Sequence, residues 1–468
     1  MSTASTRLAA KRLAKIASSE LVAATRPALR ERFLRLERGA RAQAKRIETG
    51  ERSKYPADLR NFEGVVMRAA NLVFATTNSA DLERLIEERS QFDWSIIEEA
   101  GKATGTELIA PQLLSHRRLM IGDHKQLPPF NADKMIELLS LPDKVVEALK
   151  IGAEFIGRSL RDEVTEAILD EVEESPDSAP ALCAGAIEAL TLFQTMIENE
   201  FSRKRGRSGQ TFAMRLNEQH RMHPAIASII GQTFYSEYAG DGLTTHADSK
   251  KRFADGPCPV RSLEVAKLPE VPVLLVEIEA KQAAGGRIVG EQSPRWHNGE
   301  EREAVRLILN QLRPANVKKA PTLALLSPYS QQVARLRDMI GSDTAIHPAA
   351  LGFAAPAAEG NFCFTVDSFQ GSEADVAIVS LVRNNAHTNI RSALGFLSDF
   401  IRMNVLLSRA KWRLIVVGSF RFLEEILEEA RIEGKSAEIE FLGTLFDVIA
   451  ELPPEEMRRI SIDQLRGA

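Results

Sequence analysis

The chain has 468 residues, of which 44% are hydrophobic and 26% are charged, and its formal net charge is −4. This length accommodates two or three folded domains with ordinary hydrophobic cores. The nearly balanced charge excludes a globally basic nucleic-acid-binding protein, so any basic surface has to be local.

The cysteines and the hydropathy pattern indicate the cellular compartment. Cys183, Cys258 and Cys363 are far apart and show no CxxC spacing, so neither a disulfide framework nor a zinc site is indicated. No apolar run approaches the roughly 18 residues that span a bilayer. The first 50 residues contain four Glu and no cleavage-type boundary, which argues against a targeting peptide. The sequence therefore predicts a cytoplasmic protein without a membrane segment.

The amino-terminal part predicts a basic helical segment over residues 1–55. Apolar positions in residues 5–48 recur at roughly helical spacing and are interrupted once, at Pro27. The first 60 residues contain fifteen Lys or Arg and six Asp or Glu. This excess has two interpretations, a solvated helix face or a surface that contacts nucleic-acid phosphates.

Residues 56–130 predict a partial α/β unit. Residues 71–76 (NLVFAT) indicate a strand that ends at Thr76 and Thr77, followed by a short helix over residues 81–89. Residues 92–97 form an apolar run that ends in Glu98 and Glu99, which is typical of a buried parallel strand that delivers acids to a site. A second apolar run, residues 119–121, is followed by GDHKQLPP. We expect the two strand ends to converge on one crevice, although the two acids alone would equally suit a solvated strand terminus.

The rest of the chain predicts an insertion and a second unit. Residues 131–211 show helical periodicity and an acidic stretch at 162–177, and this insertion could gate the crevice, bind a partner or decorate the surface. Residues 212–440 contain strand candidates at 271–278, 322–327, 361–366, 375–382 and 413–417, separated by helical patterns. Such alternation predicts a mostly parallel sheet covered by helices. Residues 441–468 are left as a carboxyl-terminal tail.

Several segments together resemble the motifs of superfamily 1B helicases, the Upf1-like or DNA2/NAM7-like group. They are IIEEA (96–100, motif II), GDHKQLPP (122–129, motif III), LNEQHRMHP (216–224), VDSFQGSEAD (366–375, motif V) and NVLLSRAK (404–411, motif VI), in family order. Weaker matches are residues 71–77 to motif Ic and SPYSQQ (327–332) to a segment that grips nucleic acid. The resemblance implies an α/β fold with two RecA-like parallel-sheet units, the first of them incomplete.

The resemblance also implies catalytic roles. Glu99 would orient the attacking water, and Gln126 and Arg221 would reach the γ-phosphate of ATP. Arg409 would be the arginine finger from the second unit. Glu98 would face Mg²⁺, but the family usually has Asp at this position, and the longer side chain puts the metal geometry in question.

The remaining implied residues contact the nucleotide or the nucleic acid. His220 takes the place of an aromatic ring that stacks on the base, Gln370 and Gly371 line the nucleotide side, and Glu373 accepts from a ribose hydroxyl. The residues expected at single-stranded DNA or RNA are Thr76, Thr77, Ser327, Pro328, Tyr329 and Ser368. The implied cofactors are ATP and Mg²⁺.

One expected motif has no match. The Walker A pattern Gly-x-x-x-x-Gly-Lys-Ser/Thr does not occur in residues 1–92, and GKS at 434–436 follows an acidic helix and lacks the first glycine. Three explanations remain: a segment of a longer helicase, which we favour; a separate polypeptide that supplies the loop; or a non-hydrolysing nucleic-acid-binding or scaffolding descendant. The leading prediction is the motor portion of an ATP-dependent helicase or translocase, inactive without that loop.

Overall fold

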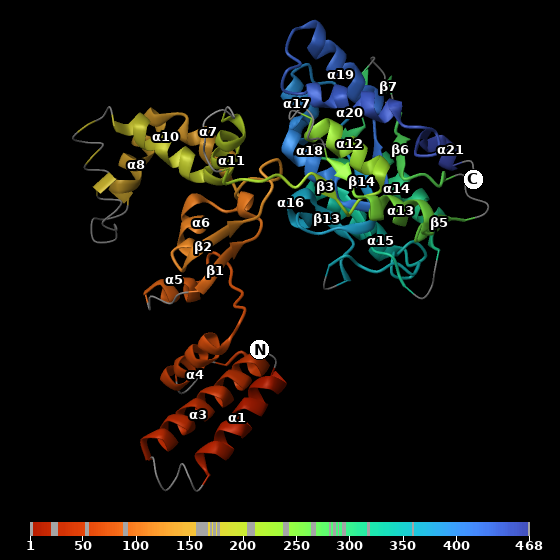
Figure 1. The fold of residues 1–468 in the computed structure, drawn as a ribbon. Helices are drawn as coiled ribbons and strands as arrows, with labels where there is room; N and C mark the ends of the chain where they lie inside the picture. The colour runs from red at the N-terminus through yellow and green to blue at the C-terminus, as the bar shows by residue number, and fades with distance from the viewer. Residues whose placement is uncertain are drawn as a thin grey trace. The chain divides into compact units, whose positions relative to one another are not determined.

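The computed structural model describes residues 3–19, 27–51, 56–87, 92–155, 178–203, 211–236, 243–263, 268–279, 296–315, 319–357 and 360–466, with short pieces at 167–168, 171, 175, 282–283, 287–288 and 290–292. The chain divides into two compact units, residues 1–90 and 91–468. Figure 1 gives the order of their helices and strands.

The first unit is helical. It contains α1 (Thr3–Ala17), α3 (Pro27–Thr49), α4 (Pro56–Ala69) and α5 (Ala80–Glu87). Ala10, Leu36, Ala40 and Phe62 form its small buried core. The predicted basic helices are confirmed, and Pro27 is the first residue of α3, a position that proline tolerates well. Because α4 packs against α3, this unit extends beyond the predicted boundary at residue 55.

The strand predicted at residues 71–76 is wrong. These residues are extended but pair with no strand among the described residues, and Leu72 and Phe74 are 75% and 91% exposed. Apolar and β-branched residues favour a strand only where a neighbouring strand completes the hydrogen bonds. Thr76 and Thr77 therefore lie in an exposed segment before α5, while the helix predicted at 81–89 is confirmed by α5 within the described residues.

The second unit begins with two parallel strands. β1 (Phe92–Ile97) and β2 (Ser115–Met120) are connected through η1 (Ala100–Lys102) and α6 (Gly105–Gln112). Both strands are confirmed, but the expected burial is wrong for most of β1, because only Ile97 is buried. Trp94, Ile96 and Leu119 are 52%, 57% and 44% exposed. Apolar sequence alone cannot tell which faces of a sheet are covered, and here one face is open.

Helix α6 packs against β1 and β2, and the insertion adds to the small core beside it. The described helices of the insertion are α7 (Ala132–Leu139), α8 (Pro142–Phe155), α10 (Ser178–Leu190) and α11 (Leu192–Ser202). Phe193 of α11 packs in one core with Ile97 and Leu108. Gly122 is needed there, because a Cβ atom would lie 3.0 Å from the Phe193 ring. Part of the predicted helical insertion is therefore core, while most of the acidic stretch 162–177 lies outside the described residues.

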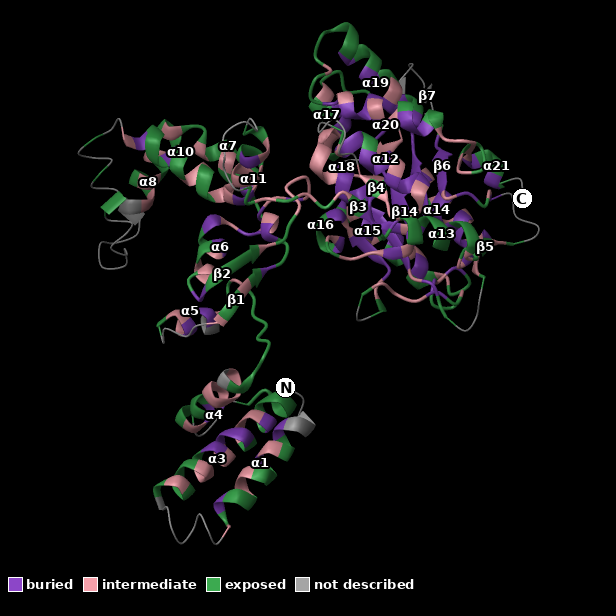
Figure 2. Ribbon diagram, viewed as in Figure 1, coloured by how far each residue is buried: buried purple, intermediate pink, exposed green. Residues whose placement is uncertain are grey.

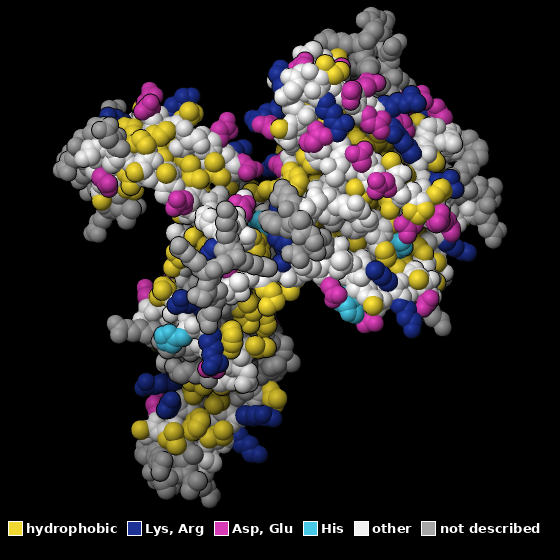
Figure 3. All heavy atoms as spheres, turned by 45° about the horizontal axis from the view of Figure 1, so that its top comes forward, with side chains coloured by type: hydrophobic (Ala, Val, Ile, Leu, Met, Phe, Trp, Pro, Cys, Tyr) yellow, Lys and Arg dark blue, Asp and Glu magenta, His cyan; other side chains and the backbone are white. Residues whose placement is uncertain are grey.

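Figure 3 shows hydrophobic side chains gathered over these insertion helices. Among the described residues no single helix is long and apolar enough to cross a membrane. Only α10 and α11 taken together reach that length and hydropathy, and the bend between them is 84°.

A six-stranded parallel sheet forms the centre of the second unit. Its strands are β6 (Val273–Glu277), β12 (Leu323–Ser327), β13 (Cys363–Thr365), β14 (Ala374–Ser380), β15 (Ala410–Gly418) and β16 (Met457–Ser461), in the order β13-β12-β14-β15-β6-β16. The five predicted strands are confirmed. Such an open parallel sheet with helical crossovers agrees with the RecA-like fold that the sequence predicted.

Further helices surround this sheet. They are α12 (Pro224–Phe234), α13 (Ala247–Asp255), α14 (Gly299–Gln311), α15 (Ser330–Ser342), α16 (Val366–Phe369), α17 (Ile390–Leu394), η4 (Gly395–Ser398), α18 (Phe400–Leu407), α19 (Phe420–Ile432), α20 (Glu440–Glu451) and α21 (Ile462–Arg466). Short strands outside the sheet are β3 (Glu218–Gln219), β4 (Thr244–Thr245), β5 (Val260–Ser262), β7 (Gln282–Ala283), β8 (Arg287–Ile288), β9 (Glu291–Gln292), β10 (His297–Asn298) and β11 (Leu312–Pro314).

Alternation along each strand supplies a core on both faces of the sheet. Val273 and Leu275 of β6 belong to the cluster that includes residues of α12, α18, α19 and α20. Leu274 and Val276 belong to the opposite cluster, with residues of α14 and α15. Figure 2 shows these central strands as buried. Because both faces are covered, the ends of the strands are held in fixed positions.

The carboxyl-terminal segment belongs to the sheet. The sequence analysis left residues 441–468 as a tail, whereas β16 pairs in parallel with β6 and α20 packs against α12. β16 has the sequence MRRIS and lies at the edge of the sheet. Its backbone hydrogen bonds, rather than an apolar side-chain pattern, hold it there, which explains why the sequence did not reveal it.

A buried carboxyl group joins α14 to the end of β14. Both carboxyl oxygens of Glu301 lie 2.9 Å from the amide nitrogen of Val382, and Ser380 Oγ donates to Glu301 at 2.6 Å. Val382 has a φ of 73°, which is uncommon for a β-branched residue. Burial raises the pKa of Glu301 to about 8. Glu301 therefore stabilises a strained turn and also responds to pH.

We expect Glu301→Gln to flatten the pH dependence of stability. The folded chain binds the Glu301 proton more tightly than an unfolded carboxyl with a pKa of 4.5 does. Its contribution to the free energy of unfolding is therefore complete below pH 4.5 and is lost as the pH rises through about 8. One proton gives a slope of up to about 1.4 kcal/mol per pH unit. Urea unfolding across this pH range measures the slope.

The control is Glu425→Gln, which removes an exposed carboxyl from α19 and should leave the slope unchanged. A Glu301→Gln slope equal to that of the unsubstituted chain would contradict the assignment.

Candidate nucleotide site

The pairing of β14 with β15 brings two predicted site residues together. Ala374 and Ala410 are partners in the parallel register, and the Ala374 amide donates to the Arg409 carbonyl at 3.0 Å. Glu373 and Arg409 immediately precede these partners. They therefore lie side by side at the amino-terminal ends of these two strands, although they are 36 positions apart in the chain.

Arg409 is held inside the second unit. Its side chain is 2% exposed and donates from Nε to the Val405 carbonyl at 2.8 Å, from Nη2 to Ser408 Oγ at 2.7 Å, and from Nη1 to the Ser372 carbonyl at 3.3 Å. Burial lowers the pKa of Arg409 to about 10, and the charge of Arg221 acts in the same direction, while Glu99 and Asp123 oppose it. The backbone and hydroxyl acceptors therefore hold the charged guanidinium in a fixed orientation beside Ser372.

Glu373 carries two basic partners. Arg221 Nε lies 2.6 Å from one carboxylate oxygen, and Lys411 Nζ lies 2.5 Å from the other. Burial acts to raise the pKa of Glu373, but the hydrogen bond from Lys411 and the charges of Arg221, Lys411 and Arg409 lower it overall. The family resemblance implied a ribose contact for Glu373, which stays a prediction. In this structure the Glu373 carboxylate pairs with Arg221, the arginine expected at the γ-phosphate.

The loop that presents Arg221 is organised by Gln219. Its side-chain oxygen accepts from the amides of Arg221 and Met222 at 2.9 and 2.7 Å, and its Nε2 donates to Thr245 Oγ1 at 2.8 Å. His223 then caps α12, because Nδ1 accepts from the Ala225 amide. Burial lowers the pKa of His223 to about 4. Gln219 and His223 therefore have structural roles in this motif, while Arg221 is left exposed.

The three other residues predicted to bind the nucleotide differ in character. The exposed ring of His220 lies against His246, with ring centroids 4.5 Å apart and planes inclined by 35°. Gln370 has its Nε2 buried, and none of the described residues accepts a hydrogen bond from it. Gly371, with a φ of 78°, follows in a conformation that favours glycine. A buried amide donor without an acceptor is unfavourable by about 1–3 kcal/mol, so a ligand acceptor would stabilise it.

The acids after β1 are exposed. Glu98 and Glu99 both face solvent, and Glu99 has a φ of 55° in the left-handed region. Glu99 Oε2 lies 3.6 Å from Lys102 Nζ. Mg²⁺ is commonly held by one or two carboxylates together with substrate phosphates, so the exposed Glu98 carboxylate fits that role. Within the described residues, no cluster of three or more His, Cys, Asp or Glu forms a metal site on its own.

The loop after β2 is tied to the second sheet through Asp123. Asp123 Oδ2 accepts from Gln126 Nε2 at 2.9 Å and from Tyr235 Oη at 2.5 Å. Asn404 Nδ2 lies 2.9 Å from both Tyr235 Oη and the Lys125 carbonyl. Burial and the Asp123 charge raise the pKa of Tyr235. This network fixes Gln126 beside the residues of the second sheet.

The predicted nucleic-acid residues of the second unit differ in exposure. Ser327 is the last residue of β12, Pro328 and Tyr329 follow it, and all three are buried; Tyr329 Oη accepts from the Phe396 amide at 3.3 Å. Ser368 is exposed, and its hydroxyl caps α16 together with Thr365, the register partner of Ser327. In this structure the three buried residues do not present their side chains for binding.

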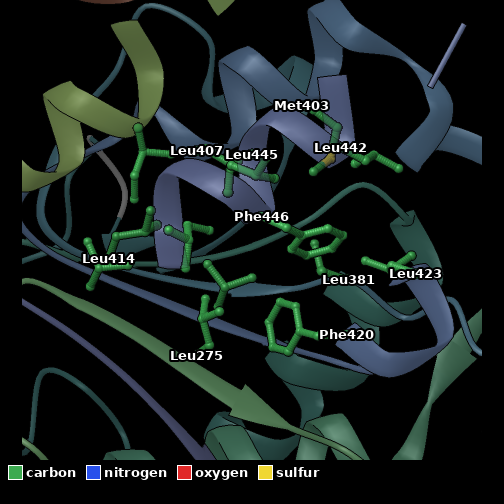
Figure 4. A pocket seen from close by; sticks show the side chains of 14 residues that line it. Leu275, Leu381, Met403, Leu407, Leu414, Phe420, Leu423, Leu442, Leu445 and Phe446 are labelled. Carbon is green, nitrogen blue, oxygen red and sulfur yellow. The ribbon is translucent and has the colours of Figure 1, made fainter. Parts of the chain in front are cut away.

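A small apolar cavity lies in the core of the second unit. It is lined by side chains such as Leu275, Leu381, Met403, Phe420 and Phe446 and holds about 20 Å³ (Figure 4). This volume is close to that of a single water and carries no polar lining. It is a packing defect in the core between the sheet and α18–α20.

Sequence reasoning missed several members of this arrangement. Lys411 and Asn404 stand inside the quoted NVLLSRAK segment, and Asp123 inside GDHKQLPP, but no role followed from their residue types. Tyr235 and Lys102 lie outside the motif cores. Their contacts join segments as much as 279 residues apart, as with Lys125 and Asn404, and no spacing rule reveals such pairs.

Comparisons with known proteins give a consistent family assignment. Residues 3–133 and 189–421 match two models that are each described as an AAA domain. The chain is 24% identical over 384 residues to a regulator of nonsense transcripts 1 homolog of Neurospora crassa, covering 81% of this chain and 27% of that protein. It is 26% identical to the probable helicase MAGATAMA 3 of Arabidopsis thaliana (81% and 37%) and 24% identical to the ATP-dependent helicase upf1 of Schizosaccharomyces pombe (77% and 30%). The chain thus spans about a quarter to two-fifths of the length of these relatives.

We expect Tyr235 and Asp123 to be energetically coupled. A hydrogen bond from a hydroxyl to a carboxylate contributes roughly 1.5–3 kcal/mol. In a double-mutant cycle with Tyr235→Phe and Asp123→Asn, urea unfolding should give a coupling energy of about 1 kcal/mol or more. The control cycle combines Asp123→Asn with Tyr329→Phe. Because the Tyr329 hydroxyl bonds the Phe396 amide, the effects of these two substitutions should be additive. Additivity of the first cycle within about 0.5 kcal/mol would contradict the network.

Proposed function

The chain belongs to the Upf1-like, or DNA2/NAM7-like, helicases of superfamily 1B, and on that premise we propose that it is the motor portion of an ATP-dependent helicase or translocase that acts on single-stranded DNA or RNA. Family membership supports an NTPase of the helicase type. The finer proposal concerns which residues of this chain bind and hydrolyse the nucleotide.

The observation that carries the proposal is the meeting of two arginines at one short segment. Arg409 donates to the Ser372 carbonyl at 3.3 Å, and Arg221 pairs with Glu373 at 2.6 Å. Phosphoryl transfer depends on cations placed around the developing charge of the phosphate oxygens. Two guanidinium groups from separate elements, beside Glu99, are the groups that such a reaction requires.

We assign the following roles to these residues. Glu99 orients the attacking water, and Gln126, held by Asp123, hydrogen-bonds the terminal phosphate. Arg221 and Arg409 stabilise the phosphate charge in the transition state. Mg²⁺, when bound by Glu98 and the phosphates, supplies further charge neutralisation.

An additional segment is proposed to complete the first sheet. A two-stranded parallel sheet with exposed Trp94, Ile96 and Leu119 on one face is unusual, because parallel sheets are normally covered on both faces. We propose that a strand and a Walker A loop, from a longer chain or a separate polypeptide, cover this face and cradle the phosphates. A non-hydrolysing nucleic-acid-binding protein is the alternative, favoured by the absence of the Walker A pattern from residues 1–92.

The proposed nucleic-acid surface has two parts. The basic helices of the first unit carry exposed Lys11, Arg12 and Lys15, which suit contacts to phosphates. Thr76 and Thr77, in the segment after α4, are candidates for backbone contacts of the same kind. Figure 3 shows basic and acidic side chains interleaved over the six-stranded part rather than one broad basic patch, so we expect binding without sequence specificity.

The decisive experiment supplies the proposed segment. We expect the 468-residue chain alone to hydrolyse ATP little above background, and the same chain with an upstream or co-expressed strand and Walker A loop to be an ATPase stimulated by single-stranded nucleic acid. In that completed protein, Arg409→Ala should lower kcat by about 10³-fold or more with a much smaller change in KM, because the contact forms mainly in the transition state.

Two controls make the experiment specific. Arg335→Ala, an exposed arginine of α15, should leave kcat unchanged. A completed protein that binds nucleic acid but shows no turnover would support the non-hydrolysing alternative, and normal turnover with Arg409→Ala would refute the assigned role.

A further inference from the structure

Four basic side chains surround the three-residue segment Gly371–Glu373. Arg409 donates to the Ser372 carbonyl, and Arg221 and Lys411 hold the two oxygens of Glu373. The fourth is Lys102, whose Nζ lies 3.7 Å from the position that a Cβ of Gly371 would occupy. The described carboxylates that pair with these cations here are Glu99 and Glu373.

Lys102 reaches this place from the acid-bearing end of β1. It is the last residue of η1, and its amide donates to the Glu99 carbonyl at 2.9 Å. Its ammonium group lies 3.6 Å from Glu99 Oε2 and is one-third exposed. The short helical turn thus fixes the lysine close to Glu99, between that acid and Gly371.

The carboxylates that pair with these cations can be exchanged for an anionic ligand. Glu99 and Glu373 are 54% and 35% exposed, so each is an accessible partner rather than a buried one. Phosphate oxygens attract ammonium and guanidinium groups more strongly than a half-exposed carboxylate does, because several contacts form at once. The buried Gln370 Nε2, for which the described residues offer no acceptor, adds a neutral donor beside the same segment.

We propose that Lys102 is a phosphate-binding residue of the nucleotide site, and that it exchanges Glu99 for the terminal phosphates of a nucleoside triphosphate. This inference rests on the proposed function and adds to it a residue that no motif assigned. It gives the site a lysine from the acid-bearing turn, in addition to any lysine that a Walker A loop supplies.

The test measures binding of a fluorescent ATP analogue, mant-ATP, with Mg²⁺ to the full chain at low ionic strength. We expect Lys102→Ala to lower the affinity for mant-ATP about tenfold or more, because the variant loses one ammonium–phosphate contact. Lys102→Arg should keep most of the affinity, which excludes a folding defect as the cause. Binding of mant-AMP should change little, because AMP lacks the terminal phosphates.

The matched control is Lys435→Ala, which removes an exposed lysine paired with Glu433 and should leave binding unchanged. Equal mant-ATP affinity of Lys102→Ala and the unsubstituted chain would overturn the inference and leave the proposed function standing. An equal loss for mant-ATP and mant-AMP would overturn it too, because Lys102 would then act on the shape of the site. An unsubstituted chain that binds no mant-ATP would also overturn the inference, because Lys102 would then hold no phosphate in this chain. The proposed function would still stand, since its own test is turnover by the completed protein.

Discussion

The parallel pairing of β14 with β15 is the constraint on which the candidate site depends. Hydrogen bonds along these strands place Ala374 opposite Ala410. The residues that precede them, Glu373 and Arg409, therefore lie side by side at the amino-terminal ends of the two strands. The two packed faces keep the strands from sliding, because a shift of one residue would reverse every side chain in the core. A rigid sheet thus sets the geometry of charged groups that flexible side chains alone could not hold.

The charges at these strand ends satisfy one another in the absence of a ligand. An isolated buried cation is strongly unfavourable, and Arg409 avoids this cost through backbone and hydroxyl acceptors, while Glu373 neutralises Arg221 and Lys411. The same arrangement prepares the site, since the cations are already oriented when an anion arrives. Binding then exchanges one set of partners for another and needs little reorganisation, which is the basis of electrostatic preorganisation.

The sequence predicted the features that arise from local chemistry. The strands of the main sheet follow from short apolar runs. The candidate site residues Arg221, Arg409 and Glu373 follow from the resemblance to helicase motifs, and their roles stay predictions. Features that depend on distant partners were missed. The carboxyl-terminal strand β16 has a polar sequence and is held by its backbone, the contact of Lys102 with the Gly371 segment spans 269 residues, and the open face of β1 depends on what covers it. The apolar segment 71–76 was overpredicted for the same reason, because strand formation needs a neighbour.

The most direct test of this account is a structure of the chain with a non-hydrolysable ATP analogue and Mg²⁺. The account predicts that Arg221 leaves Glu373, from which it now lies 2.6 Å, and binds the terminal phosphate beside Arg409 and Lys102. A structure in which the Arg221–Glu373 and Lys102–Glu99 pairs persist, with the nucleotide bound elsewhere, would contradict it.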